Sequence, residues 1–281
     1  MTNKTSGFLR MLEHKNLNPV DYSLIVVSYK NTKKIDPTEV IIDKISLNEL
    51  IGKKLRLSFS GVIRCVDCGK ITKKSFGGGS CFKCFQSLAS NDFCILKPSG
   101  CHFHLGTCRE KEWGLNNCFK PHKLYLANST GIKVGITKEN PIHKRWVDQG
   151  AIMGLPLIEV ESRLNSGILE DEFSKFITDK SQWQKLISED SAQIDLKKES
   201  IDLLQKVDLN RFDFSIKILK EESTKIQYPI LSYPKKKKSL KPDPNSPLEG
   251  ELLGIKGQYL LFEEGGMNIR SLSGYEVDIS L

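Results

Sequence analysis

The sequence contains no long hydrophobic run. Its N-terminal segment, MTNKTSGFLRMLEHK, lacks the extended apolar stretch of a secretory signal peptide. Every apolar run elsewhere is far shorter than the roughly 20 residues that span a bilayer. No internal repeat is evident either. We therefore expect a cytoplasmic protein that has no membrane partner.

Acidic residues are the minority among the charged ones. Lys and Arg total 42 against 34 Asp and Glu, which gives a net charge of +8 and a pI near 8.9. The hydrophobic content of 39% is ordinary for a soluble globular protein, and 281 residues suffice for one or two cores. The basic balance favours an anionic partner such as nucleic acid, either DNA or RNA.

Eight cysteines in a chain without an export signal favour reduced thiols and metal binding over disulfides. Cys65 and Cys68 form one pair, Cys81 and Cys84 form another, and twelve residues lie between the pairs. Two residues between thiolates let one turn place both sulfurs on a single Zn²⁺, and Gly69 suits such a turn. A thioredoxin-like redox pair is the alternative, but it lacks a βαβ context here. We predict a closed, structural zinc site.

The spacing of the other four cysteines is less informative, and His102, His104 and His122 lie among them. A second zinc is a candidate here, because a cysteine and a histidine separated by three residues make an acceptable half-site. Its ligands would be Cys101, Cys108, Cys118 and His122. The six and nine residues that separate these cysteines are not a standard spacing of zinc ligands, however. Free cysteine is also often a small buried hydrophobic residue. Both interpretations, with Cys94 left unassigned, stay open.

A hairpin occupies the centre of the chain, within LYLANSTGIKVGITKENPIHKRWVDQG (Leu124–Gly150). An apolar strand around Tyr125 is followed by the turn cluster Asn-Ser-Thr-Gly, and Ile132–Ile136 then alternates with the β period. A helix is predicted to begin near Pro141, with Asn140 as its N-cap. This arrangement directs Gly135, Thr137 and Arg145 toward one corner, where a surface hairpin with a solvated arginine is the alternative.

A third strand, LPLIEVES, and a second helix follow the hairpin. The helix is predicted over Gly167–Leu186, capped by Asn165 or Ser166. Apolar residues at helical spacing mark its buried face: Leu169, Phe173, Phe176 and Ile177. Glu170 borders this face, where a carboxylate can reach a cleft while its helix stays packed; a solvated border glutamate is the alternative.

The middle third of the chain resembles the GIY-YIG nuclease superfamily, in its divergent phage-type branch. Tyr125 matches the tyrosine of the first half-motif, and Gly135 matches the glycine of the second. Arg145 matches the arginine on the following helix. Glu170 matches the helix glutamate that holds the metal, with Glu172 as the fallback. The resemblance implies a three-stranded antiparallel sheet with helices and a phosphodiesterase centre.

The resemblance also implies a role for each matching residue. Glu170 would hold one Mg²⁺ or Mn²⁺ that polarises the phosphate. Tyr125 would orient or deprotonate the attacking water, and Arg145 would stabilise charge in the transition state. Lys133 stands where a second tyrosine is usual, and a point charge cannot copy the hydrogen bonding of a hydroxyl. The hairpin is also a few residues shorter than in the GIY-YIG pattern. These two departures affect the expected activity more than the expected fold.

The two ends of the chain predict a β module. Ser23–Val27 (SLIVV) indicates a buried strand, and Lys54–Phe59 (KLRLSF) alternates. After a proline-rich stretch, the strand patterns GELLGI, QYLLFEE and MNIRSL should pair with the strands of residues 20–64. Lys235, Lys236, Lys237 and Lys238 lie in that proline-rich stretch as a basic loop, suited to phosphate contacts or merely solvated.

The sequence thus predicts an α+β protein with a GIY-YIG-like sheet, a zinc ribbon and a β module formed by both termini. Between the nuclease-like domain and the basic loop, Ile201, Leu203, Leu204 and Val207 suggest a packing helix. The predicted regions are an N-terminal β module (1–64), a cysteine-rich region (65–122), the GIY-YIG-like domain (123–190), a helical connection (191–226) and the basic loop with the C-terminal strands (227–281).

Nearly the full length also resembles an uncharacterised bacterial family of unknown function. The segments that carry this resemblance are CILKPSGCHFHLGTCRE, LYLANSTGIKVGIT and GIKGQYLLFEEGGMNIR. The leading function is nucleic-acid binding with a metal-dependent endonuclease centre. A non-catalytic, zinc-stabilised nucleic-acid-binding protein is the alternative, because the second tyrosine is missing. A thiol-redox or metal-handling role depends on the surplus cysteines alone.

Overall fold

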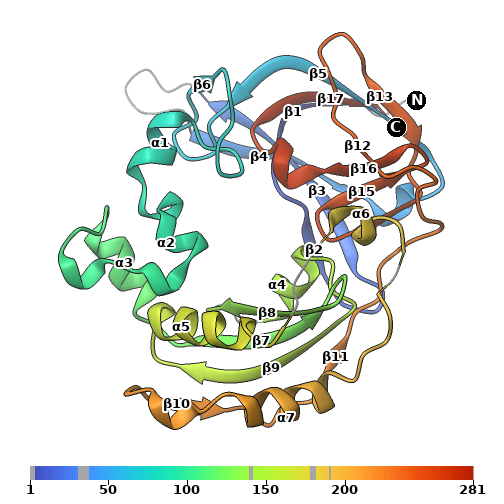
Figure 1. Ribbon diagram of the computed structural model, residues 1–281. Helices are drawn as coiled ribbons and strands as arrows, with labels where there is room; N and C mark the ends of the chain where they lie inside the picture. Colours follow the sequence, from blue (N-terminus) through green and yellow to red (C-terminus); the bar gives the residue numbers. More distant parts are fainter. Residues whose placement is uncertain (1–3, 31–37, 139–141, 178–181, 190, 281) are drawn as a thin grey trace. The chain divides into compact units, whose positions relative to one another are not determined.

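The computed structural model describes residues 4–30, 38–138, 142–177, 182–189 and 191–280. It confirms the α+β class, because helices accompany several antiparallel sheets (Figure 1). The chain forms two compact units, and each is described by itself. The first unit comprises Met1–Gln86, Ile187–Glu189 and Gln227–Leu281, and the second comprises Ser87–Leu186 and Asp190–Ile226.

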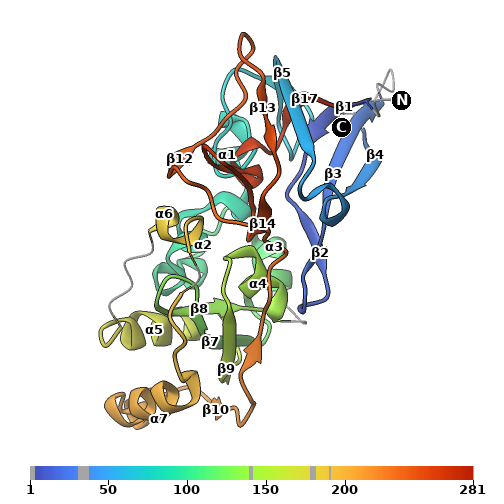
Figure 2. The same cartoon turned by 90° about the vertical axis from the view of Figure 1, so that its right-hand side faces the viewer.

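An eight-stranded sheet forms most of the first unit, in the order β13-β5-β17-β1-β3-β2, with β4 paired to β3 and β6 paired to β5. Its strands are β1 (Lys4–Leu9), β2 (Glu13–Lys15), β3 (Asp21–Lys30), β4 (Thr38–Ser46), β5 (Lys54–Arg64), β6 (Ile71–Thr72), β13 (Leu248–Glu251) and β17 (Tyr275–Ser280). In β5 the buried Leu55 and Leu57 alternate with the exposed Lys54 and Arg56, as the period of two requires. β17 pairs with both β1 and β5, so strands from the two ends of the chain share one sheet (Figures 1 and 2).

A second sheet in this unit differs from the predicted pairing. Its order is β12-β16-β15-β14, and its strands are β12 (Lys238–Ser239), β14 (Gly254–Lys256), β15 (Tyr259–Phe262) and β16 (Gly265–Asn268). The sequence predicts that GELLGI, QYLLFEE and MNIRSL pair with the strands of residues 20–64. The start of GELLGI, in β13, does pair with β5, whereas β14, β15 and β16 pair with one another. Gly257, at φ 62°, closes the first hairpin, and such short loops cost little entropy compared with distant pairings.

The sheet of the second unit extends beyond the three predicted strands. β7 (His122–Asn128), β8 (Ile132–Thr137) and β9 (Met153–Val160) are those three, with β7 in the middle. Two further strands, β10 (Ile216–Ile218) and β11 (Thr224–Lys225), come from the region predicted as a helical connection, and both pair antiparallel with β9. They satisfy the backbone groups that β9 would otherwise leave as an open edge.

Helices α5 (Arg163–Ser174) and α7 (Leu196–Lys206) contribute to one core with β7 and β9. Leu169 and Phe173 pack there with Leu124, Leu126 and Leu203, all of them buried. The helices of the second unit are α2 (Phe93–Leu96), α3 (Lys111–Cys118), α4 (His143–Asp148), α5 (Arg163–Ser174), α6 (Trp183–Leu186) and α7 (Leu196–Lys206). In the predicted packing helix α7, Leu203 is buried but Ile201 is 53% exposed.

The predicted helix Gly167–Leu186 begins and ends too late. α5 starts at Arg163, because Ser162 has an extended backbone and its hydroxyl accepts the amide of Asn165 at 3.2 Å. Ser166 lies inside the helix, and Phe176, beyond the helix end, is 45% exposed. The predicted start of the preceding helix, at Asn140 and Pro141, lies outside the described residues. The compact units also divide the predicted cysteine-rich region after residue 86.

Candidate functional site

Two turns bring the first four cysteines together. Cys65 follows β5, and the amide of Gly69 donates to the Cys65 carbonyl at 2.9 Å. Gly69 has φ 69°, a conformation that glycine adopts without a Cβ penalty. The amide of Cys81 donates to the Cys65 sulfur at 3.1 Å, and Cys84 lies on α1 (Phe82–Ser87). The sulfurs of Cys65, Cys68, Cys81 and Cys84 all lie within 4.8 Å of one another.

The surroundings of this cluster suit a divalent cation. Burial raises the pKa of the Cys65 and Cys84 thiols. A backbone hydrogen bond at Cys84 lowers the pKa of Cys81. A metal at the centre of four sulfurs would offset the cost of holding several thiolates in a buried place. The four cysteines can therefore hold a zinc ion, as their spacing predicts.

Gly135 makes room for Tyr125. The two residues are opposite each other on β8 and β7. A Cβ at Gly135 would lie 2.5 Å from the Tyr125 hydroxyl, so the tyrosine ring crosses directly over the glycine. Tyr125 is fully buried, and the ring of Trp146 meets it edge-on at 6.0 Å between centroids. The paired tyrosine and glycine therefore fix where the hydroxyl points.

Helix α4 brings Arg145 to that hydroxyl. Arg145 hydrogen-bonds to Tyr125, and the tyrosine donates to Oε1 of Gln149 at 3.2 Å. Trp146 packs directly on Gly154 of β9, where any Cβ would collide with its ring. Burial raises the pKa of Tyr125 to about 12, although the charge of Arg145 lowers it. Tyr125 is therefore protonated at neutral pH and acts as a hydrogen-bond donor.

Glu170 completes this neighbourhood from α5. Its carboxylate is near enough that its charge raises the pKa of Tyr125. Burial raises the pKa of Glu170 to about 7, with a further contribution from Asp171, while Arg163 and Arg145 lower it. The structure thus brings together a tyrosine hydroxyl, a guanidinium and a half-buried carboxylate from β7, α4 and α5. A carboxyl group with this pKa is poised between proton and cation binding.

The other two predicted residues of this centre differ in their surroundings. Lys133 is partly buried on β8 and lies opposite Ala127, on the same sheet face as Gly135. Glu172 forms ion pairs with Lys175 and Arg211, and these contacts lower its pKa. Glu172 is therefore held by two cationic side chains.

The residues of the predicted second zinc site do not assemble as one set. In the described part of the chain, groups of three or more ligand side chains within 4.8 Å are the four-cysteine cluster and a second group of Asp92, Cys94 and His102. His122 is instead buried at the start of β7, with Nδ1 2.8 Å from the Lys120 carbonyl oxygen. No such group joins His122 to Cys101, Cys108 or Cys118.

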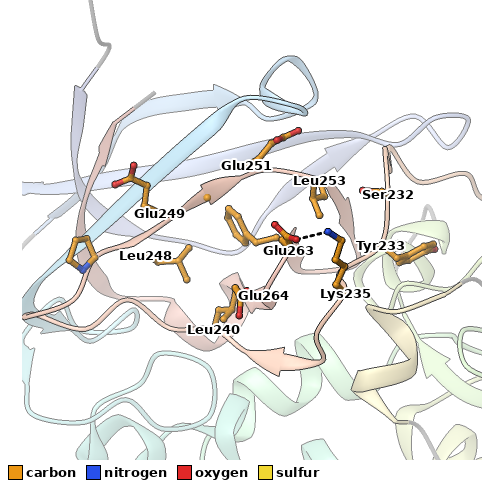
Figure 3. Close-up of a pocket in the computed structure, with 13 residues that line it drawn as sticks. Ser232, Tyr233, Lys235, Leu240, Leu248, Glu249, Glu251, Leu253, Glu263 and Glu264 are labelled. Atoms are coloured by element: carbon orange, nitrogen blue, oxygen red, sulfur yellow. Dashed lines mark hydrogen bonds and ion pairs between the residues drawn. The ribbon is translucent and has the colours of Figure 1, made fainter.

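The lysine run adjoins a pocket in the first unit. The pocket has a volume of about 480 Å³, and Lys235 is the one lysine that lines it. Figure 3 shows Lys235 directed at Glu263, to which it pairs at 2.7 Å. Lys236 and Lys238 pair with Glu264 at 2.8 and 3.8 Å. Part of the positive charge of this run is therefore balanced within the protein.

Two residues near these sites were not anticipated from the sequence. Gln149 accepts the Tyr125 hydrogen bond, and its position four residues after Arg145, on the same helix face, is the signal that could have indicated it. Asp92 joins Cys94 and His102, but a single aspartate gives no signal because such residues are common on surfaces.

Comparison with known protein families gives a match. A model of the family described as "Protein of unknown function (DUF2797)" matches residues 52–277. No curated protein and no solved structure matches the chain. Among the described residues, no helix is both long and apolar enough to cross a membrane. Because the family match extends over most of the sequence, the chain belongs to the DUF2797 family.

Proposed function

We propose that this protein binds nucleic acid and cleaves a phosphodiester bond with the help of a divalent cation, through a divergent GIY-YIG centre. The observation that carries the proposal is the convergence of Tyr125, Arg145 and Glu170, which lie far apart in the sequence. These are the residues that match the GIY-YIG pattern. Hydroxyl, guanidinium and carboxylate are the groups that a metal-assisted attack on phosphate requires.

Glu170 is the proposed ligand of Mg²⁺ or Mn²⁺. Its carboxylate offers the hard oxygen that these cations prefer, and the bound ion would polarise the phosphate. Arg145 would meet the charge that develops on the phosphate oxygens. Tyr125 would orient the attacking water through its hydroxyl oxygen and not deprotonate it, because a pKa of about 12 keeps the group protonated. Lys133 would add positive charge at the position of the missing tyrosine.

The four-cysteine cluster has a separate role in this proposal. Four thiolates around one Zn²⁺ leave no position open for substrate, so the zinc would be structural. Cys65, Cys68, Cys81 and Cys84 would hold it, and the zinc would fix the turn regions that follow β5. The catalytic ion and the structural ion are thus assigned to different ligands and different units.

Cleavage of a substrate panel tests the catalytic proposal. We expect Mg²⁺ or Mn²⁺ to support cleavage of at least one member of a panel of single-stranded, duplex and branched DNA and RNA. Glu170→Gln should abolish cleavage, and Arg145→Ala should lower the rate on the order of 10²–10³-fold, as the loss of comparable electrostatic donors does. The matched controls are Glu172→Gln and Lys144→Ala, neighbours on the same helices, which should retain cleavage.

The alternative is a non-catalytic nucleic-acid-binding protein, and the same panel separates it. If no member is cut while wild type and Glu170→Gln bind the panel equally, the catalytic proposal fails. Binding itself should weaken with salt. Neutralising Lys235–Lys238 should flatten the log–log salt slope by up to about 0.9 per lysine in contact with duplex DNA. An unchanged slope would exclude this lysine run from the interface.

A further inference from the structure

A second group of metal-ligating side chains lies apart from the four-cysteine cluster. Atoms of Asp92, Cys94 and His102 that can bind a cation all lie within 4.8 Å of one another. Asp92 is buried and caps α2, on which Cys94 lies, and His102 immediately precedes η4 (Phe103–Leu105). Two turns of the chain therefore present a carboxylate, a thiol and an imidazole to one point.

The hydrogen bonds of His102 leave Nε2 as the atom that faces this point. The Thr107 hydroxyl donates to the His102 carbonyl at 3.2 Å and lies 2.8 Å from Nδ1, so Nδ1 is occupied by this contact. Nε2 of His102 lies 3.3 Å from Oδ2 of Asp92, so the two atoms are close enough for one cation to contact both.

Arg109 and the backbone hold the carboxylate in place. The Arg109 side chain lies 3.0 Å from Oδ2 of Asp92, and the Phe93 amide donates to Oδ1 at 2.6 Å. These contacts resemble the outer hydrogen bonds that orient ligands in metal sites. The thiols of Cys101 and Cys118 lie near enough to interact electrostatically with Cys94.

We propose that Asp92, Cys94 and His102 bind a zinc ion, whose coordination a fourth ligand completes. Zinc is the metal for this site, because carboxylate oxygen, thiolate sulfur and imidazole nitrogen are all zinc ligands and four of them make a tetrahedron. The ligand set differs from the one that the cysteine spacing predicts, since it uses Asp92, Cys94 and His102 in place of Cys108 and His122.

The position of the site gives it a structural consequence. Residues 95–99 pack on α5, where Arg163 donates to the Ile95 carbonyl at 2.7 Å and Ser99 donates to Asp171 at 2.5 Å. A Cβ at Gly167 would lie 2.5 Å from the Ser99 amide nitrogen, so the two segments are in close contact. The zinc would fasten the segment that supports α5, the helix of Glu170. Its presence does not depend on the proposed nuclease activity.

Metal content of the full-length protein tests this inference. After expression in zinc-supplemented medium and exhaustive dialysis, elemental analysis and native mass spectrometry should find two zinc ions per wild-type chain. Cys94→Ser and His102→Asn should each leave one. His104→Asn is the matched control, because this exposed histidine lies two residues from His102 on η4 and should leave both ions bound.

Three outcomes would overturn the inference. The first is a single zinc ion in the wild type that His102→Asn retains. The second is loss of an ion in folded Cys108→Ser or His122→Asn while His102→Asn keeps both. The third needs no variant: X-ray absorption at the zinc edge should show nitrogen or oxygen ligands at about 2.0–2.2 Å, and a purely sulfur environment would exclude this site.

Discussion

Tyr125 and Gly135 are packed so closely that the tyrosine ring leaves no room for a side chain at position 135. The hydroxyl lies where the Cβ of any larger residue at position 135 would be, and the same hydroxyl contacts Arg145 and Gln149. A change at the glycine therefore acts on the proposed centre through the tyrosine. No change of charge or hydrogen-bonding group is involved, so the effect is one of space.

Gly135→Ala should destabilise the protein by about 1–3 kcal/mol, the usual cost of adding a methyl group to a packed core. The ring of Tyr125 must move, because the new Cβ would lie 2.5 Å from its hydroxyl. Urea unfolding monitored by circular dichroism measures the loss. Gly100→Ala is the control, since no atom lies within 4 Å of a Cβ there. Equal stability of the two variants would contradict the described contact.

The raised pKa of Glu170 predicts how metal binding depends on pH. Because its pKa is about 7 without metal, the carboxyl group is mostly protonated below that pH, and a cation must displace the proton. The Mn²⁺ affinity should therefore rise about tenfold per pH unit up to about pH 7 and level off above it. Isothermal titration calorimetry from pH 5.5 to 8.5 measures this, and Glu172→Gln should leave the profile unchanged. A flat profile would show that Glu170 is not the ligand.

At the scale of elements, the start of α5 sets the orientation of Glu170. The helix begins after Ser162, whose hydroxyl accepts the Asn165 amide. Both sequence candidates for the cap, Asn165 and Ser166, lie inside the helix. The sequence pattern does not indicate Ser162, because the apolar stripe only begins at Leu169. Caps are decided by backbone conformation, which apolar spacing does not report.

Ser162→Ala should cost about 1 kcal/mol of unfolding free energy, because a helix amide loses its acceptor. Asn165→Ala should have a smaller effect, since Asn165 contributes its backbone amide and not its side chain to the cap. Guanidinium unfolding of both variants makes the comparison. A larger loss for Asn165→Ala would place the helix start where the sequence pattern predicted it.

At the scale of the whole molecule, the sequence was most informative where chemistry needs fixed spacing. The spacing within the two Cys-x-x-Cys pairs predicted that the four cysteines form one cluster, because a two-residue spacing places both sulfurs on one side of a turn. Alternating residues in β5 and β8 likewise predicted strands. The grouping of Asp92 with His102 could not be predicted, since it depends on how two turns meet. The pairing of β10 and β11 along β9 depends in the same way on long-range contact.

Removing zinc should unfold the first unit. A structural zinc supplies about 10–16 kcal/mol of apparent binding energy, more than the net stability of most domains. Cys81→Ser should therefore yield insoluble or unfolded protein, and a strong chelator should lower the melting temperature until zinc is restored. Thermal unfolding with and without added zinc measures this. Zinc-free protein with an unchanged melting temperature would exclude a structural metal at the four cysteines.

The pairing of β17 with both β1 and β5 has a consequence for synthesis of the chain. A ribosome releases residues in order, so β1 and β5 emerge long before the strand that joins them. The second unit ends at Ile226 and can complete its own sheet during translation, whereas the first unit must wait for residues 275–280. Until then, the strands of the first unit offer open edges to other chains. Chaperone dependence during translation should therefore be greatest for the part that is made first.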